Sequence, residues 1–360
     1  MRLDAFTKRV MRKNKSNQSR LPLTISAQYG LVDQITFFNK VVASTDLSNY
    51  YLLKKGEFAY NKSYSSDYPW GAIKRLDNYD QGALSSLYIC FAPQDNVVSD
   101  FILQYFESPK WHKGISEIAV EGARNHGLLN VAVQDFFHTY HYVPKDKKEQ
   151  IKISKLLMLL DERIVTQNKI IEDLKKLKSA ISHILFPSKG AIHLSEIANV
   201  VMGQSPSSNA YNDQGLGMPL VQGNLDISNG KTTPRLYTAE FNQTTEKGNI
   251  ILTVRAPVGE VAKATQKVCL GRGVCAIIPH EENMSDFIYQ YLTFYKFMWR
   301  RYEQGSTFTS INGSDVRNIF CPKVRNVSIL TLLDIKINIE ERVVKQYQSQ
   351  KQYMLYQMFI

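Results

Sequence analysis

The stretch from Asp146 to Phe186 constrains the fold of this chain most, because it contains neither Pro nor Gly before Pro187 and Gly190. Its apolar side chains recur at steps of four and three residues, which is a heptad pattern. A helix of about 40 residues would be about 60 Å long, far longer than a typical globular helix. We therefore predict a rod, with a pairing seam formed by Ile153, Leu157, Leu160, Ile164, Ile171, Leu174, Ile181 and Leu185.

The same pattern returns at the C-terminus at one constant offset of 173 residues, without a gap. The offset matches Asp161 with Asp334, and it also matches the polar residue Lys178 inside the seam with Lys351. Chance matches polar interruptions less often than apolar rows, so we favour two copies of one helix over two unrelated amphipathic helices. The seam of the second copy is Leu330, Leu333, Ile337, Val344, Tyr347, Met354 and Met358.

Two features of the rods leave alternatives open. A second apolar row at Leu156, Ile170, Leu177 and Ile184 indicates a surface beyond the one needed for pairing. The seam lysines Lys178 and Lys351 could extend their charge to water, and the matched pair Gln167 and Glu340 could fix the register of pairing.

Each rod follows a globular segment, and these segments also repeat. SDFILQYF at 99–106 returns as SDFIYQYL at 285–292, and RLDAFTKRV at 2–10 is answered by HLSEIANVV at 193–201. Short runs of β-branched and aromatic residues between turns predict strands. We expect an α/β fold of the α+β type, with domains at 1–145 and 188–324 and rods at 146–187 and 325–360. The rods would pair as an antiparallel coiled coil with pseudo-twofold symmetry.

The basic composition suits a nucleic-acid binder, although many basic proteins bind no nucleic acid. The formal net charge is +11 and the pI is about 9.3, as is common in nucleic-acid binders. The four cysteines form no C-x-x-C pair, so we expect buried thiols in a reducing cytoplasm. The basic N-terminus lacks the apolar core of a signal peptide, and no apolar run approaches the length of a membrane span.

The sequence offers little catalytic chemistry. None of the 12 prolines are adjacent, so the Asn/Asp-Pro-Pro-aromatic motif of adenine methyltransferases is absent. Gly230-Lys231-Thr232 imitates the end of a P-loop, but Leu225 stands where that motif needs Gly, so a turn is favoured. His138 and His141 would point to opposite faces of a strand, which favours packing over a metal pair.

DNA contacts are the more plausible role of the polar residues. Arg and Lys bind phosphate and guanine, Asn and Gln pair with adenine, and Ser and Thr bind phosphate. Glycines would let the backbone approach the duplex. Two domains on a rigid spacer would read two half-sites, since DNA repeats its face about every 34 Å and rods of this length can place the domains about one turn apart. Because the two domains differ in sequence, the half-sites should differ too. The candidates, any of which could be an ordinary surface residue, are Lys62, Ser63, Tyr64, Lys74, Arg75, Arg124 and Asn125 in the first domain, and Gly203, Gln204, Ser205, Gln222, Asn224, Arg255, Gln304, Ser306 and Thr307 in the second.

The whole chain resembles the specificity subunits of type I restriction-modification systems. The resemblance rests on the central helix, on HLSEIANVVMGQSPSSNAYNDQG, on GNIILTVRAPVGEVAKA with CLGRGVCAI, and on QGSTFTSINGSDVRNI. It implies a non-catalytic subunit whose two target-recognition domains read a bipartite, asymmetric double-stranded DNA sequence. The paired helices would bind two modification (adenine-N6 methyltransferase) subunits, and restriction subunits would join them. S-adenosylmethionine, ATP and Mg²⁺ would be bound by those partners and no cofactor by this chain.

The second copy departs from the family pattern because it has no counterpart of Glu149-Gln150 before its helix, and it stops one residue after Phe359. These short ends could weaken helix pairing. Three alternatives therefore stay open: a fused restriction-modification enzyme or free nuclease, a stand-alone DNA-binding protein, and a subunit of another restriction-modification type.

Overall fold

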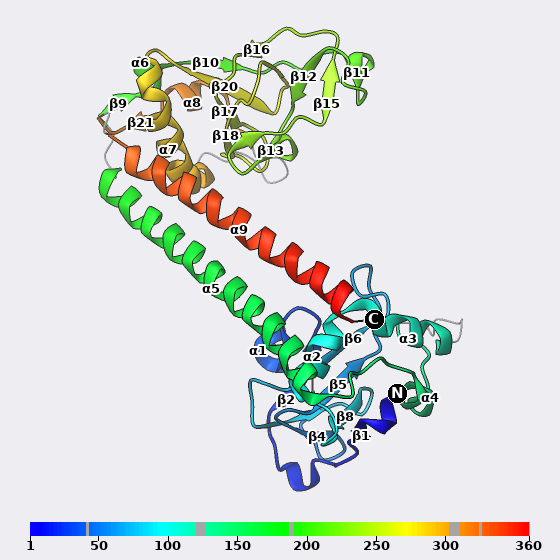
Figure 1. The fold of residues 1–360 in the computed structure, drawn as a ribbon. Helices are drawn as coiled ribbons and strands as arrows, with labels where there is room; N and C mark the ends of the chain where they lie inside the picture. Colours follow the sequence, from blue (N-terminus) through cyan, green and yellow to red (C-terminus); the bar gives the residue numbers. More distant parts are fainter. Residues whose placement is uncertain (41–42, 120–126, 187–190, 302–309, 324–325, 360) are drawn as a thin grey trace. The chain divides into compact units, whose positions relative to one another are not determined.

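The computed structural model describes residues 1–40, 43–119, 127–186, 191–301, 310–323 and 326–359. The chain forms two compact units. Unit 1 comprises Met1–Gln167 and Val343–Ile360, and unit 2 comprises Asn168–Arg342. Each unit therefore contains one globular domain together with a segment of each long helix (Figure 1).

The domain of unit 1 is built on two four-stranded sheets among its described residues, with orders β1-β8-β5-β6 and β3-β2-β7-β4. Its strands are β1 (Thr7–Arg9), β2 (Pro22–Ser26), β3 (Gly30–Asp33), β4 (Tyr51–Lys54), β5 (Phe58–Asn61), β6 (Ala72–Arg75), β7 (Gln81–Leu84) and β8 (Ile89–Pro93). Its helices are α1 (Gln34–Phe38), α2 (Ser99–Glu107), α3 (His112–Ile118) and α4 (Val133–His138), with 3-10 turns η1 (Leu3–Ala5), η2 (Lys15–Asn17) and η3 (Pro109–Trp111).

The domain of unit 2 repeats this plan with more strands. Its described sheets have the orders β10-β20-β17-β18-β14-β13, β11-β15-β12-β19-β16 and β21-β9. The strands are β9 (Ile192–His193), β10 (Ala198–Met202), β11 (Tyr211–Asn212), β12 (Met218–Val221), β13 (Ile227–Ser228), β14 (Lys231–Thr232), β15 (Leu236–Thr238), β16 (Thr244–Thr245), β17 (Ile250–Thr253), β18 (Val261–Lys263), β19 (Val268–Leu270), β20 (Val274–Pro279) and β21 (Phe320–Cys321). The helices are α6 (Leu194–Ile197), α7 (Ser285–Tyr295) and α8 (Gly313–Arg317), with 3-10 turns η4 (Ser208–Ala210), η5 (Asn224–Asp226), η6 (Glu282–Met284) and η7 (Lys296–Arg301).

The two long helices are α5 (Lys147–Leu185) and α9 (Ser328–Met358). Both are uninterrupted because their sequences contain no Pro or Gly. In unit 2 their segments run antiparallel, since Lys178 of α5 pairs with Asp334 of α9, and three residues earlier Lys175 pairs with Glu341. The predicted tandem repeat of a mixed α/β domain followed by a long helix is confirmed.

The core of each unit extends onto its helical segments. In unit 1, aromatic side chains from β5, β8 and α2 form a core cluster. Leu157 of α5 and Phe359, which follows α9, belong to the same cluster. In unit 2, the core includes Leu330 of α9 and Phe186, which follows α5. None of the fifteen predicted seam residues is exposed, whereas the second apolar row is 40–74% exposed. Seam residues near the ends of the helices pack into the domain cores, which attaches each helical segment to the domain of its unit.

The polar interruptions of the seam form the same network in each unit. In unit 1, Asp161 of α5 accepts hydrogen bonds from Lys351 Nζ (2.6 Å) and from Gln104 Nε2 of α2 (3.0 Å). In unit 2, Asp334 accepts from Lys178 Nζ (2.5 Å) and from Gln290 Nε2 of α7 (2.7 Å). The seam lysines are thus ion-paired across the helices and do not simply extend to water, so each network joins three elements of its unit.

Candidate nucleic-acid interface

The residues that follow strands β5 and β17 form equivalent backbone bridges in the two units. After β5, Ser63 forms an antiparallel bridge with Leu128, and after β17, Arg255 forms one with Ser310. Ser63 and Arg255 were both predicted to contact DNA, and they occupy equivalent positions in the repeat.

A hollow lies beside each of these positions. The unit 1 hollow, of about 210 Å³, is lined by residues 61–63, 87–88 and 128–130. The unit 2 hollow, of about 290 Å³, is lined by residues 222–226, 235, 255–256 and 272–273. Both combine the segment that follows β5 or β17 with the turn that precedes β8 or β20, so the repeat forms a hollow from the same segments twice.

The unit 2 hollow brings together three predicted residues, Gln222, Asn224 and Arg255, from two separate segments. It adds two arginines that sequence reasoning missed, Arg235 and Arg272. Amide and guanidinium side chains are the groups that pair with adenine and guanine edges. With three arginines around two amides, this surface can bind the DNA backbone and read bases.

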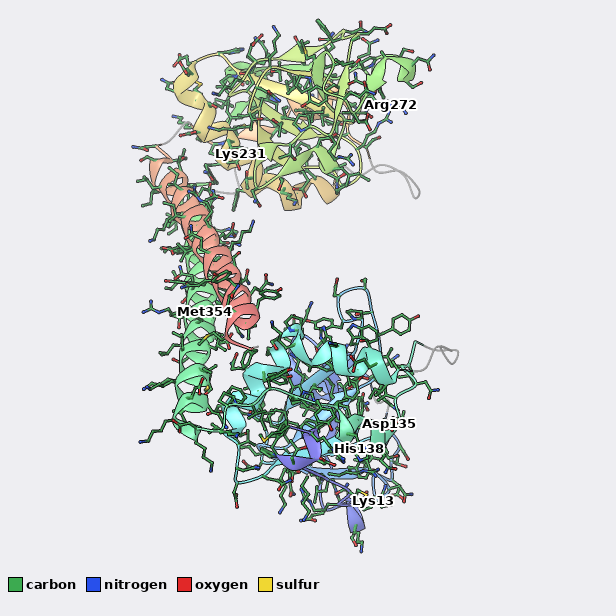
Figure 2. The ribbon with its side chains drawn as sticks, turned by 45° about the vertical axis from the view of Figure 1, so that its right-hand side comes forward. Lys13, Asp135, His138, Lys231, Arg272 and Met354 are labelled. Atoms are coloured by element: carbon green, nitrogen blue, oxygen red, sulfur yellow. The ribbon has the colours of Figure 1, made fainter. Side chains whose placement is uncertain are left out.

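The turn that carries Arg272 depends on glycine. A Cβ on Gly273 would meet the carbonyl oxygen of Gln222 at 2.1 Å, and a Cβ on Gly203 would meet that of Gly271 at 2.1 Å. Gly203 is therefore needed for close packing against the turn at Gly271 inside unit 2. The packed turn leaves the side chain of Arg272 exposed (labelled in Figure 2).

The neighbouring predictions Gln204 and Ser205 lie beside this turn. The hydroxyl of Ser205 accepts a hydrogen bond from the backbone N–H of Arg272 at 3.1 Å, and Gln204 is exposed. Ser205 thus anchors the arginine turn, and Gln204 is open to solvent at its edge.

In unit 1, the predicted residues Lys62, Ser63 and Tyr64 follow β5 directly. Ser63 and Tyr64 are exposed, and the Tyr64 ring is available for stacking. Lys62 is half-buried and its ammonium donates to the carbonyl of Val131 at 3.4 Å. The lining of the unit 1 hollow that the structure describes has one basic residue, so it is much less basic than that of unit 2.

Lys74 and Arg75 have structural partners instead of a free surface. Lys74 Nζ lies 2.6 Å from Glu107, and Arg75 lies 2.7 Å from both Asp77 and Asp100. Both side chains are only 12% exposed. In unit 2 the equivalent of the Arg75–Asp100 pair is Lys263–Asp286, which likewise joins the end of a strand, here β18, to a helix, here α7. We therefore assign these two residues to holding α2 on β6.

Five predicted residues, Arg124, Asn125, Gln304, Ser306 and Thr307, lie outside the described residues.

Of the two arginines that the sequence reasoning missed, one had a recognisable sequence signal and the other had none. Arg272 stands between two glycines in CLGRGVC, which marks a close-packed turn. Arg235 had no such signal. It lies near the end of β12 only because the chain reverses through the β13–β14 hairpin and β15 then pairs with β12.

The segments considered for other chemistry have structural explanations. Asn229 and Gly230 both have positive φ values and form the turn between β13 and β14, so the P-loop imitation is a hairpin turn. His141 is buried and its ring nitrogens contact Tyr105 Oη (3.0 Å) and Thr139 Oγ1 (2.7 Å). The described residues contain no cluster of three or more potential metal ligands.

The cysteines are buried and unpaired, as predicted. Burial raises the pKa of the Cys90, Cys275 and Cys321 thiols to about 12, which keeps them protonated and unreactive. Within the described ranges, no helix combines the length and the apolar character that a membrane span needs.

Comparison with known proteins gives a consistent result. Residues 190–346 match the family of type I restriction modification DNA specificity domains. A curated type I restriction enzyme MjaX specificity subunit of Methanocaldococcus jannaschii is 30% identical over 252 residues, which are 64% of this chain and 59% of the relative. The match thus spans less than two thirds of the length of that relative.

Two solved structures share the fold. The type I restriction-modification S subunit of M. genitalium has a TM-score of 0.62 at 19% identity, with 100% of this chain and 95% of that chain covered. A structure from work on complex assembly and conformational transition of a type I system has a TM-score of 0.63 at 19% identity, covering 99% and 95%. The chain is thus similar in sequence to a type I specificity domain over residues 190–346 and to a type I specificity subunit over 252 residues, and it shares the fold of these solved structures.

Proposed function

We propose that this chain is the DNA sequence-specificity subunit of a type I restriction-modification complex. It binds a bipartite, asymmetric double-stranded DNA target and carries out no catalysis itself. The observation that carries the proposal is the hollow formed from equivalent segments in both units, with arginine and amide side chains around that of unit 2. One reading surface in each unit gives two half-sites.

The two surfaces differ in chemistry, which supports an asymmetric target. The unit 2 hollow has three arginines with Gln222 and Asn224, whereas the unit 1 hollow has Lys62 beside the exposed hydroxyl of Ser63. Hydrogen-bonding side chains of different kinds select different base edges. The half-sites should therefore have different sequences.

The partners we propose are two copies of a modification subunit. Leu156 and Leu159, near the start of α5 in unit 1, are 40% and 47% exposed. The offset of 173 residues matches them with Ile329 and Leu332, at the start of α9 in unit 2, which are 47% and 60% exposed. Exposed apolar groups of this kind mark interaction sites, and a repeated pair fits two copies of one partner.

The sequence predicted a partner surface along the whole second apolar row, whereas the repeated pair restricts the proposed surface to the start of each helix. Of the second apolar row, Leu177 and Ile184 correspond to Gln350 and Gln357 in α9, so that part of the row is not repeated. Restriction subunits would join the complex through the modification subunits or through other surfaces of this chain. S-adenosylmethionine, ATP and Mg²⁺ belong, in this proposal, to the partner subunits.

The proposal is tested by sequencing modified bases in the genome of the host with and without this gene. We expect N6-methyladenine to disappear from one split, asymmetric motif when the gene is deleted. An unchanged set of methylated motifs would contradict the proposal and favour a stand-alone DNA-binding protein.

A further inference from the structure

We propose that Arg235 reads a guanine in the half-site bound by unit 2, and that Asp226 is the residue that positions it. This inference rests on the proposed function and adds the identity of one base. Arg235 lies directly before β15, in the unit 2 hollow, and its side chain is 57% exposed. Its ion pair with Asp226 distinguishes it from Arg255 and Arg272, the other two arginines of this hollow.

The carboxylate of Asp226 is fixed on both oxygens. Its Oδ1 accepts a hydrogen bond from Arg235 Nε at 3.0 Å, and its Oδ2 accepts one from the backbone N–H of Gln222 at 2.9 Å. The Asp226 side chain is only 5% exposed. Since Gln222 directly follows β12, the carboxylate couples the orientation of Arg235 to the end of a strand.

This contact leaves the outer edge of the guanidinium free. Nε is the nitrogen that Asp226 engages, and among the described residues neither Nη group of Arg235 has a hydrogen-bond partner. Two parallel N–H groups on a fixed plane match the O6 and N7 acceptors of guanine in the major groove. A buried carboxylate behind the guanidinium also removes rotamer freedom before binding, which lowers the entropy lost on contact.

Arg255 and Arg272 provide the contrast. Both are exposed, and no ion pair to a carboxylate is found for either among the described residues. An arginine without an orienting partner suits phosphate, which is approached from many directions and carries no sequence information. The hollow therefore has one arginine held by a carboxylate, which suits a base, and two arginines without such a partner among the described residues, which suit the backbone.

The test uses the complex of this chain with its modification subunits. Once the methylated motif is known, binding is measured by competition between duplexes that carry each of the four base pairs at each position. We expect the intact complex to prefer guanine at one position of one half-site by roughly 5- to 150-fold. Arg235→Lys keeps the charge but lacks the planar fork, so it should lose this preference and keep most of the affinity and its salt dependence.

Two further variants complete the design. Asp226→Asn should relax the preference at the same base pair. Arg272→Ala is the matched control, and it should weaken binding to all duplexes alike without changing any preference. If Asp226→Asn does not fold, Arg235→Lys alone decides the matter.

Several outcomes would overturn the inference. Arg235→Lys could keep every base preference, or it could weaken all positions equally, and either result would show that Arg235 reads no base. A wild-type complex with a defined bipartite motif and no guanine dependent on Arg235 leaves the proposed function standing while it removes this inference. A wild-type complex without base preference anywhere contradicts both.

Discussion

At the scale of single residues, His141 makes unit 1 sensitive to acid. Burial, together with the nearby N-terminal ammonium, lowers the pKa of His141 from 6.5 to about 4. The unfolded chain therefore binds a proton between these pH values while the folded chain does not. The stabilising effect is complete above about pH 6.5 and is lost as the pH falls towards 4, and it amounts to roughly 3 kcal/mol.

We predict that His141→Gln removes this loss of stability between pH 6.5 and 4. The measurement is the urea-unfolding free energy of the full chain across that range, followed by aromatic fluorescence, since Trp111 belongs to the same core as His141. His138→Gln is the control for replacing a histidine of the same domain, because the His138 side chain is 43% exposed. A profile in which both variants behave like the wild type would show that His141 does not titrate as described.

At the scale of secondary-structure elements, the start of each long helix should bind one modification subunit. We predict that replacing Leu156 and Leu159 together with Gln lowers the number of bound modification subunits from two to one. Doing the same at Ile329 and Leu332 should have the same effect, and the four changes together should abolish binding. Loss of exposed apolar contacts acts on the complex and leaves the isolated chain stable.

Native mass spectrometry of the assembled complex counts the subunits directly. Val165→Gln is the matched control, because Val165 is also exposed on α5, at 68%, but corresponds to a polar residue, Asn338, in α9. Two bound subunits in all variants would rule out the helix starts as the docking sites.

The long helices could be predicted from the sequence because the heptad pattern is local and occurs twice. The heptad pattern and the offset of 173 residues predicted α5, α9 and the seam. The polar residues matched by that offset form the hydrogen-bond networks around Asp161 and Asp334. The short strands were less readable, since strands of two to six residues depend on pairing between distant segments.

The candidate site was only partly readable for the same reason. Lys74 and Arg75 looked like surface cations in the sequence, because the carboxylates of Glu107 and Asp100 that engage them lie 25 or more residues away. Arg235 and Asp226 were missed, since their contact depends on the β13–β14 hairpin that separates them. The equivalence of Ser63 and Arg255 also needed the strand pairing.

At the scale of the whole molecule, the proposed function and the repeat together predict that the two units read their half-sites independently. The reading segments of unit 1 and unit 2 belong to separate domains with separate cores, and each domain holds its own hollow. Changes at well-separated, independent sites have additive effects. A substitution in one hollow should therefore change one half of the target and leave the other half and the gap as they are.

We predict that Ser63→Ala with Tyr64→Ala alters or relaxes one half of the methylated motif. The measurement is sequencing of modified bases in a host that carries the variant in place of the natural gene. Arg75→Lys is the control supplied by the repeat, because Lys263 makes the equivalent ion pair in unit 2, so the motif should not change. Changes in both halves from the unit 1 variant would show that the units are coupled, and reading would then be a property of the assembled complex and not of each domain.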